Sequence, residues 1–352
     1  MKKLLLSVIV ICFTISVNAQ SLGKIKTTNK KWAFKTMKKA TKRIFINSFN
    51  VNFEVYKEAI DFKAGGNGGR IGGNTSSSTA KAAIGLGGID GVKMQEKTNQ
   101  LYKNYIKRLK AEGYEIITSE EVAKTEAIKD WDKATGPYLK ENLSGIITCA
   151  PENFTFYYKK KGFFDFGSSG IQAKLAKQLN NAIVTDVNLY VIFSETGNDW
   201  MKGRAAKVKI KTNLRLVGEY AITIPQKFKK KKTTLGKLFG SVKIKGASDI
   251  HRVSSNVAFY DQVQASYTGT LKEDLEINDI MKKEKVVAYQ KQGSFTPTSF
   301  STFSNYLDAK ADRFSTTTKW INVDGDKYAE GFYNACNTFL DKQLDEFFDK
   351  LK

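Results

Sequence analysis

The sequence predicts an α+β protein in which mixed β-sheets are covered by packed amphipathic helices. Residues 206–217 alternate apolar side chains with basic or polar ones, a pattern typical of a strand with one face in the core. Residues 326–351 carry large apolar side chains along one helical stripe, which predicts a long C-terminal helix docked on a sheet. A chain of 352 residues is long enough to bury such a core without disulfides.

The N-terminal third contains one clear strand and one clear helix. Residues 20–42 are rich in lysine and predict a short helix or an arm. Residues 43–56 alternate apolar and polar side chains, so we expect a half-buried strand. Residues 64–91 are rich in glycine and serine, which predicts a loop, and their glycines lack the spacing of a phosphate-binding motif, which argues against a nucleotide site. Residues 94–112 predict an amphipathic helix that Gly113 ends as a left-handed cap.

Several shorter elements follow residue 113. Thr118 lies three positions before Glu121, which is the spacing of a capping box, so a helix should begin there. Apolar patterns predict further strands at 114–117, 143–148, 154–158, 184–193 and 257–271, and a helix at 171–181.

The first residues have the features of a secretory signal peptide. Lys2 and Lys3 precede an apolar run that is too short to span a bilayer, and Ala19 suits signal peptidase. We therefore expect export, to the periplasm or the exterior, after cleavage before Gln20. The chain is then divided into a signal peptide at 1–19, an amino-terminal α/β region at 20–150 and a β-rich region at 151–352 that the C-terminal helix closes.

The processed chain would carry a net charge of about +20, since Lys2 and Lys3 leave with the leader. Seven of the 57 basic residues are arginine, so lysine carries the excess. Lysine is a hydrated point charge, which favours diffuse attraction to polyanions over specific reading of nucleic acid. The densest stretch predicts a polyanion-binding site at Lys227, Lys229, Lys230, Lys231, Lys232, Lys237, Lys243 and Lys245.

No catalytic, cofactor or metal site is predicted. His251 is the one histidine, and it cannot form a zinc-type cluster with two distant cysteines. Asp130 and Asp132 flank Trp131, as acids and tryptophans do in glycan-cleaving sites, but a polar loop around one buried tryptophan is the simpler explanation.

Two further motifs have structural explanations. Residues 322–326 begin like a calcium loop but lack its later glycine and glutamate, so Asp324 or Asp326 is expected to cap the final helix. Lysines 159–161 lie between aromatic residues, a combination that binds nucleic acid or glycans in some proteins, but a core strand followed by a basic turn is the preferred explanation.

The processed chain keeps two cysteines, Cys149 and Cys336. Two separate buried thiols are expected, with a disulfide bridge as the alternative in an oxidising compartment.

The order strand, loop, helix ending in LKAEGYEII and capped helix TSEEVAK resembles a known domain. It is similar to the amino-terminal α/β domain of TolB and to the related domain of the curli-secretion lipoproteins. The resemblance covers residues 43–56 and 94–125, and it implies an α/β fold in the cell envelope. The glycine-rich insertion and the absence of a lipoprotein cysteine depart from the curli-secretion pattern, and no functional residue is transferred.

Three functions remain open from the sequence. The first is a non-enzymatic envelope or secreted protein that binds an anionic surface or polymer, or assembles with partners. Anionic polysaccharide, lipopolysaccharide and other envelope proteins are the candidate partners, and no transmembrane helix is predicted in the processed chain. The second is a secreted hydrolase of an acidic polymer, and the third is an oligomeric translocation component implied by the resemblance.

Overall fold

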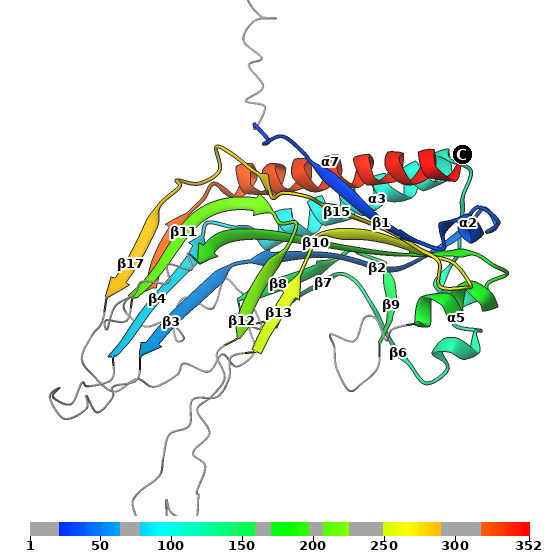
Figure 1. Ribbon diagram of the computed structural model, residues 1–352. Coiled ribbons are helices and arrows are strands. Elements are labelled where there is room, and N and C mark those ends of the chain that lie inside the picture. The colour runs from blue at the N-terminus through cyan, green and yellow to red at the C-terminus, as the bar shows by residue number, and fades with distance from the viewer. Residues whose placement is uncertain are drawn as a thin grey trace, which may run out of the picture.

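The computed structural model describes residues 21–63, 78–143, 145–158, 170–196, 207–224, 249–289 and 318–352. It confirms the α+β class, with mixed sheets and a long C-terminal helix (Figure 1).

The main sheet joins strands from both halves of the sequence. Its strands run in the order β1-β15-β14-β10-β2-β8-β7, and β11 pairs with the C-terminal part of β10. The central strands β2 and β10 are parallel, whereas their outer neighbours are antiparallel. The strands of this sheet are β1 (Thr27–Trp32), β2 (Arg43–Glu54), β5 (Glu115–Ile116), β7 (Tyr138–Leu143), β8 (Ile146–Ala150), β10 (Ile183–Thr196), β11 (Lys207–Leu216), β14 (Asn256–Tyr260), β15 (Ser266–Leu271), β16 (Leu275–Glu276) and β17 (Lys285–Tyr289).

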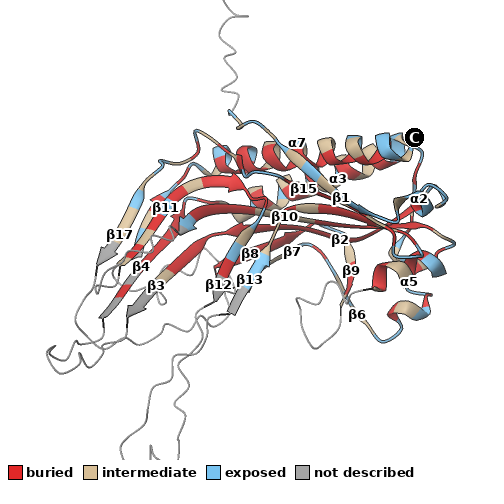
Figure 2. Cartoon of the chain, viewed as in Figure 1, coloured by how far each residue is buried: buried red, intermediate tan, exposed pale blue. Residues whose placement is uncertain are grey.

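Two long helices cover one face of this sheet, α3 (Gly91–Ala111) and α7 (Gly325–Leu351) (Figure 1). Asp90 and Asp324 cap their N-termini by accepting hydrogen bonds from backbone amides, as the Asp324 prediction anticipates. The main core lies between the helices and the sheet, and Figure 2 shows it as a continuous buried layer. Gly113 ends α3 with φ of 83°, which confirms the predicted left-handed cap.

The opposite face of the main sheet is only partly covered (Figure 1). The hairpin of β12 (Tyr220–Ile224) and β13 (Asp249–Val253) lies at one end, and the helix α5 (Ile171–Gln178) lies at the other. Smaller elements complete the fold: α2 (Phe34–Met37), α4 (Ser119–Val122), the 3₁₀ turn η1 (Glu126–Ile128), the pair β6 (Asp132–Thr135) and β9 (Thr155–Tyr158), and a sheet of β3 (Tyr56–Lys63), β4 (Ser78–Gly87) and β18 (Thr318–Asn322).

The single strand predicted at 143–148 is instead the end of β7 and the start of β8. The structure corrects four other predictions about these elements. The N-terminal arm contains an edge strand, β1, whose sequence is mostly polar and shows no apolar alternation. Part of the predicted 64–91 loop, Ser78–Gly87, is strand β4. The single strand predicted at 257–271 is a hairpin, β14 and β15, because Asp261 holds a turn through bonds to the backbone amides of Val263 and Ala265.

The fourth correction concerns the strand at 43–56. Its alternation predicts a half-buried strand, yet almost every residue of β2 is buried. Asn50 and Asn52 are buried although they lie on the polar face, and both line the site described next.

Candidate functional site

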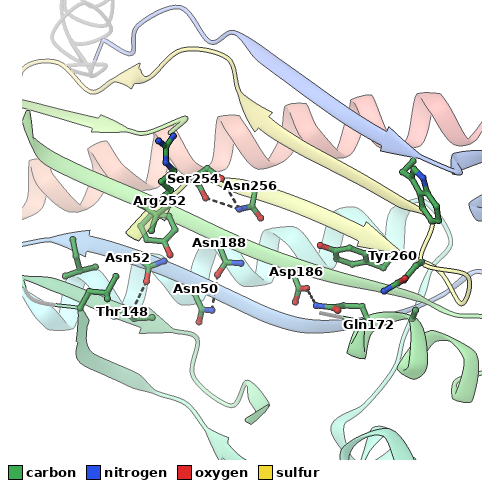
Figure 3. Close-up of a pocket in the computed structure, with 18 residues that line it drawn as sticks. Asn50, Asn52, Thr148, Gln172, Asp186, Asn188, Arg252, Ser254, Asn256 and Tyr260 are labelled. Atoms are coloured by element: carbon green, nitrogen blue, oxygen red, sulfur yellow. Dashed lines mark hydrogen bonds between the residues drawn. The ribbon is translucent and has the colours of Figure 1, made fainter. Parts of the chain in front are cut away.

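A cavity of about 820 Å³ occupies the partly covered face of the main sheet (Figure 3). Its floor consists of strands β2, β10, β14 and β8, while β13 and α5 contribute its two ends. Because α3 and α7 hold the other face of the same strands, this floor rests on a packed core.

Three asparagines form a row across the floor. Asn188 of β10 lies directly opposite Asn50 of β2 on one side and opposite Asn256 of β14 on the other. Residues that are directly opposite share one face of a sheet, and all three line the cavity. Asn50 Nδ2 donates to Asn188 Oδ1 at 3.2 Å, so the two amides orient each other (Figure 3).

The row continues beyond the cavity toward the edge of the sheet. Asn256 lies opposite Thr270 of β15, and Thr270 lies opposite Thr28 of β1. By the same register Lys30 lies opposite Thr268, and Trp32 lies opposite Ser266. Since these residues share the face of the asparagine row, a polar surface runs from the cavity to an edge bearing a lysine and a tryptophan.

A second polar pair extends the floor in the other direction. Thr148 Oγ1 of β8 donates to Asn52 Oδ1 at 2.6 Å, and Asn52 Nδ2 donates to the carbonyl of Leu189 at 3.1 Å. Both side chains are buried and line the cavity. They are therefore held in fixed orientations before any ligand arrives.

Asp186 is the one carboxylate among the described residues that line the cavity. Its Oδ1 accepts from Asn47 Nδ2 at 2.7 Å and from Ser48 Oγ at 2.8 Å, and its Oδ2 accepts from Gln172 Nε2 at 2.8 Å. Burial raises the pKa of Asp186, and these three donors oppose that shift. The bond from Gln172 fastens α5 to the sheet, so the carboxylate has a clear structural role (Figure 3).

Aromatic and cationic groups complete the lining. Tyr190 and Tyr260 are part-buried, and burial raises the pKa of each to about 12, so both are neutral hydroxyls at physiological pH. Trp32 is 60% exposed at the edge of the sheet. Arg252 of β13 supplies an exposed guanidinium at the hairpin end.

A separate ionic cluster lies beyond the cavity, where β2, β10 and β11 meet. Glu54 Oε2 accepts from the Ser194 amide at 2.8 Å, and Tyr220 donates to Glu54 Oε1 at 3.3 Å. Arg215 donates to the carbonyl of Ser194 at 3.0 Å and pairs with Asp274. Arg215 is buried, although the strand pattern predicts an exposed basic face. These groups bond mostly to one another and to the backbone, so the cluster is structural.

The sequence motifs lie outside the cavity or serve the fold. His251 is exposed on β13. Asp130 is exposed in a turn, and Trp131 packs half-buried against a small apolar cluster. Cys149 and Cys336 are both free and buried, which confirms the two separate thiols.

Of the aromatics around the predicted basic turn, Phe154, Phe156 and Tyr157 are buried, as a core strand requires. Lysines 159–161 lie outside the described residues. So do Lys227, Lys229, Lys230, Lys231, Lys232, Lys237, Lys243 and Lys245, the whole predicted polyanion-binding site. That stretch connects β12 to β13, and its flanking residues Ile224 and Asp249 are paired across the hairpin.

Within the described ranges, no group of three or more His, Cys, Asp or Glu side chains lies close enough to hold a metal ion. No helix in the same ranges has the length and apolar character needed to cross a membrane. Comparisons with protein-family models, with curated proteins and with solved structures give no match.

Sequence reasoning missed the cavity residues, although a signal was present. In β2 the polar residues at alternate positions are Ser48, Asn50 and Asn52, and the phenylalanines next to them occupy the other alternating positions. In β10, Asp186 and Asn188 repeat this alternation. Asparagine is depleted in ordinary strands, so its repetition on one face of two neighbouring strands is a signal of a special polar face.

Proposed function

We propose that this protein is exported and binds an acidic polysaccharide of the cell envelope in the cavity of its main sheet, without cleaving it. The observation that carries the proposal is the in-register row of Asn50, Asn188 and Asn256. Fixed carboxamides on rigid strands form the kind of polar floor that orients a ligand in a concave site.

The chemistry of the lining favours a hydroxyl-rich ligand. A carboxamide offers two donors and two acceptors, and a sugar hydroxyl both donates and accepts. Tyr190 and Tyr260 add neutral hydroxyls and aromatic surface, and the exposed indole of Trp32 can pack against the apolar face of a sugar ring. The row continues through Thr270 and Thr28 to the edge, which suits a polymer longer than the cavity.

The charges around the cavity favour an acidic polymer. Arg252 lies at the hairpin end and Lys30 at the edge-strand end, so cations border the polar floor on two sides. The net charge of the processed chain, about +20, adds long-range attraction for a polyanion.

Binding without cleavage is proposed because glycoside hydrolysis by most enzymes requires two carboxyl groups about 5 to 9.5 Å apart. Asp186 is the single carboxylate lining the described part of the cavity, and Asn47, Ser48 and Gln172 already bond to it. A hydrolase and an oligomeric translocation component remain alternative hypotheses.

Binding and turnover measurements test the proposal together. Acidic and neutral polysaccharides are titrated by calorimetry, and release of reducing ends is followed over a day. We expect an acidic polymer to bind, Asn188→Leu to weaken binding by about tenfold because one to two hydrogen bonds are lost, and no reducing ends to appear.

The matched control is Asn337→Leu on α7. Asn337 Oδ1 also accepts from another asparagine, Asn104, at 3.1 Å, but on the helix side of the protein. Equal affinities for the two variants would exclude the asparagine row as the binding surface, and release of reducing ends would favour the hydrolase.

A further inference from the structure

One end of the molecule combines exposed lysines with exposed apolar side chains. We call it the basic end: Lys30, Lys31, Trp32, Lys35, Lys38, Lys39 and Val263. Residues 30–39 contain five exposed lysines and no carboxylate. Trp32 and Val263 are two of the three most exposed large hydrophobic residues in the described chain, at 60% and 51%.

Hydrogen bonds and strand pairing bring these residues together. Trp32 lies opposite Ser266, which begins the strand that follows the turn carrying Val263. Thr36 of α2 donates to Asp261 Oδ2 at 2.7 Å, which fixes the short helix to the same turn. Phe34 of α2 packs edge-on against Phe347 of α7, so the exposed lysines of α2 and its flanks lie on an anchored helix.

The carboxylate that joins this turn to α2 does not cancel the lysine charge outside. Asp261 is 1% exposed and accepts from the Val263 and Ala265 amides at 2.9 Å as well as from Thr36. Lys30, Lys35 and Lys38 have no ion pair among the described residues.

We infer that the basic end docks on an anionic phospholipid membrane, with Trp32 and Val263 entering the headgroup region and the lysines contacting the lipid charges. Tryptophan is enriched at membrane interfaces, and each lysine near an anionic surface strengthens binding. The exposed valine distinguishes a membrane from a free polyanion, because an aliphatic tip contributes nothing to binding phosphate or carboxylate in water. Docking would place the edge of the cavity, where Trp32 lies, beside the membrane surface.

Vesicle binding by the chain without residues 1–19, which keeps every described residue, tests this inference. The vesicles contain phosphatidylcholine alone or with phosphatidylglycerol, and some carry lipids brominated in the acyl chains to quench tryptophan fluorescence. We expect salt-sensitive binding to the anionic vesicles and quenching that the Trp32→Phe variant loses.

Two pairs of test and control variants show whether the basic end is the surface that binds vesicles. Lys35→Gln/Lys38→Gln/Lys39→Gln should weaken vesicle binding on the order of 100-fold, since each lysine contributes about fivefold. Its control, Lys103→Gln/Lys107→Gln/Lys110→Gln, removes equal charge from the exposed side of α3 and should have little effect. Val263→Ser should weaken vesicle binding about tenfold. Val92→Ser, at the exposed start of α3, should leave vesicle binding unchanged.

The cavity is assayed separately with a free acidic polysaccharide. The lysine and valine variants keep Trp32 and every residue of the asparagine row, so they test docking without changing the proposed cavity contacts. The lysine variant should bind that polymer within about twofold of the parent. Equal vesicle binding by test and control variants would overturn the docking inference. So would a loss of polymer binding that matches the loss of vesicle binding, without tryptophan quenching, because the basic end would then be a polymer site.

Discussion

Phe347 of α7 stacks on Phe259 of β14, with ring centroids 3.7 Å apart and ring planes 4° apart. The next residue on β14, Tyr260, lines the cavity on the opposite face of the strand. Helix packing and the candidate site therefore share one strand. We predict that Phe347→Ala lowers the free energy of unfolding by about 3 to 5 kcal/mol, because it removes a buried ring and leaves a cavity. Guanidinium unfolding measures this, and a loss below about 1 kcal/mol would mean that the stack does not hold the helix on the strand.

The apolar stripe of α7 should not tolerate a charge. Leu340 is 3% exposed, so Leu340→Asp would bury a carboxylate without a partner and cost several kcal/mol, a large part of the roughly 5 to 15 kcal/mol that stabilise a domain. Thr338→Asp, two residues away on the exposed side, is the control. Thermal melting compares them, and equal melting temperatures would contradict the docking of α7.

The two cysteines should behave as unreactive thiols. Burial raises the pKa of Cys149 to about 12 and also raises that of Cys336, so neither ionises near pH 8. A thiol reagent at pH 8 should label neither cysteine in the folded processed chain and both in denaturant. A bridged pair would instead stay unlabelled in denaturant until a reductant is added.

The contribution of Asp186 to the free energy of unfolding should be largest at low pH. Burial raises the folded-state pKa of Asp186 above the unfolded value of about 4, so its stabilising contribution is full below about pH 4 and is lost as pH rises through the folded-state pKa. The stability of the parent minus that of Asp186→Asn should therefore decrease from pH 4 upward. Denaturant unfolding across this range measures the difference. An increase with pH would show that the donors from Asn47, Ser48 and Gln172 outweigh burial.

Export and processing are tested by amino-terminal sequencing of protein recovered from outside the cytoplasm. The order of charged, apolar and small residues in the leader predicts a start at about Gln20. Recovery of protein that starts at Met1 would remove the basis for an envelope location.

Long amphipathic elements could be predicted from the sequence because packing and periodicity agree in them. The predicted helix at 326–351 is observed as Gly325–Leu351, and the strand at 184–193 lies within Ile183–Thr196. Edge strand β1 was missed because one of its faces meets only water, which removes the apolar alternation. Strand β4 was missed because glycine and alanine give a weak strand signal, and Gly85 is required where the Trp320 ring packs against the backbone.

The candidate site could not be predicted because it arises from register. Asn50 and Asn188 are 138 positions apart, and only the parallel pairing of β2 with β10 brings their amides within 3.2 Å. The local sequence shows that each strand has polar side chains on one face. It does not show that α5 and the β12–β13 hairpin will border that face and form a cavity.

The side-chain amide signals of Asn50, Asn188 and Asn256 offer the most direct test of the central claim. Each signal is assigned in a ¹H–¹⁵N spectrum through its Asn→Leu variant, and the acidic polysaccharide that binds best by calorimetry is then added. If this cavity binds the polymer, these three signals shift with a common saturation curve, while the amide of Asn104 on the helix side stays in place. Saturable binding that leaves all three asparagine signals unmoved would contradict the account.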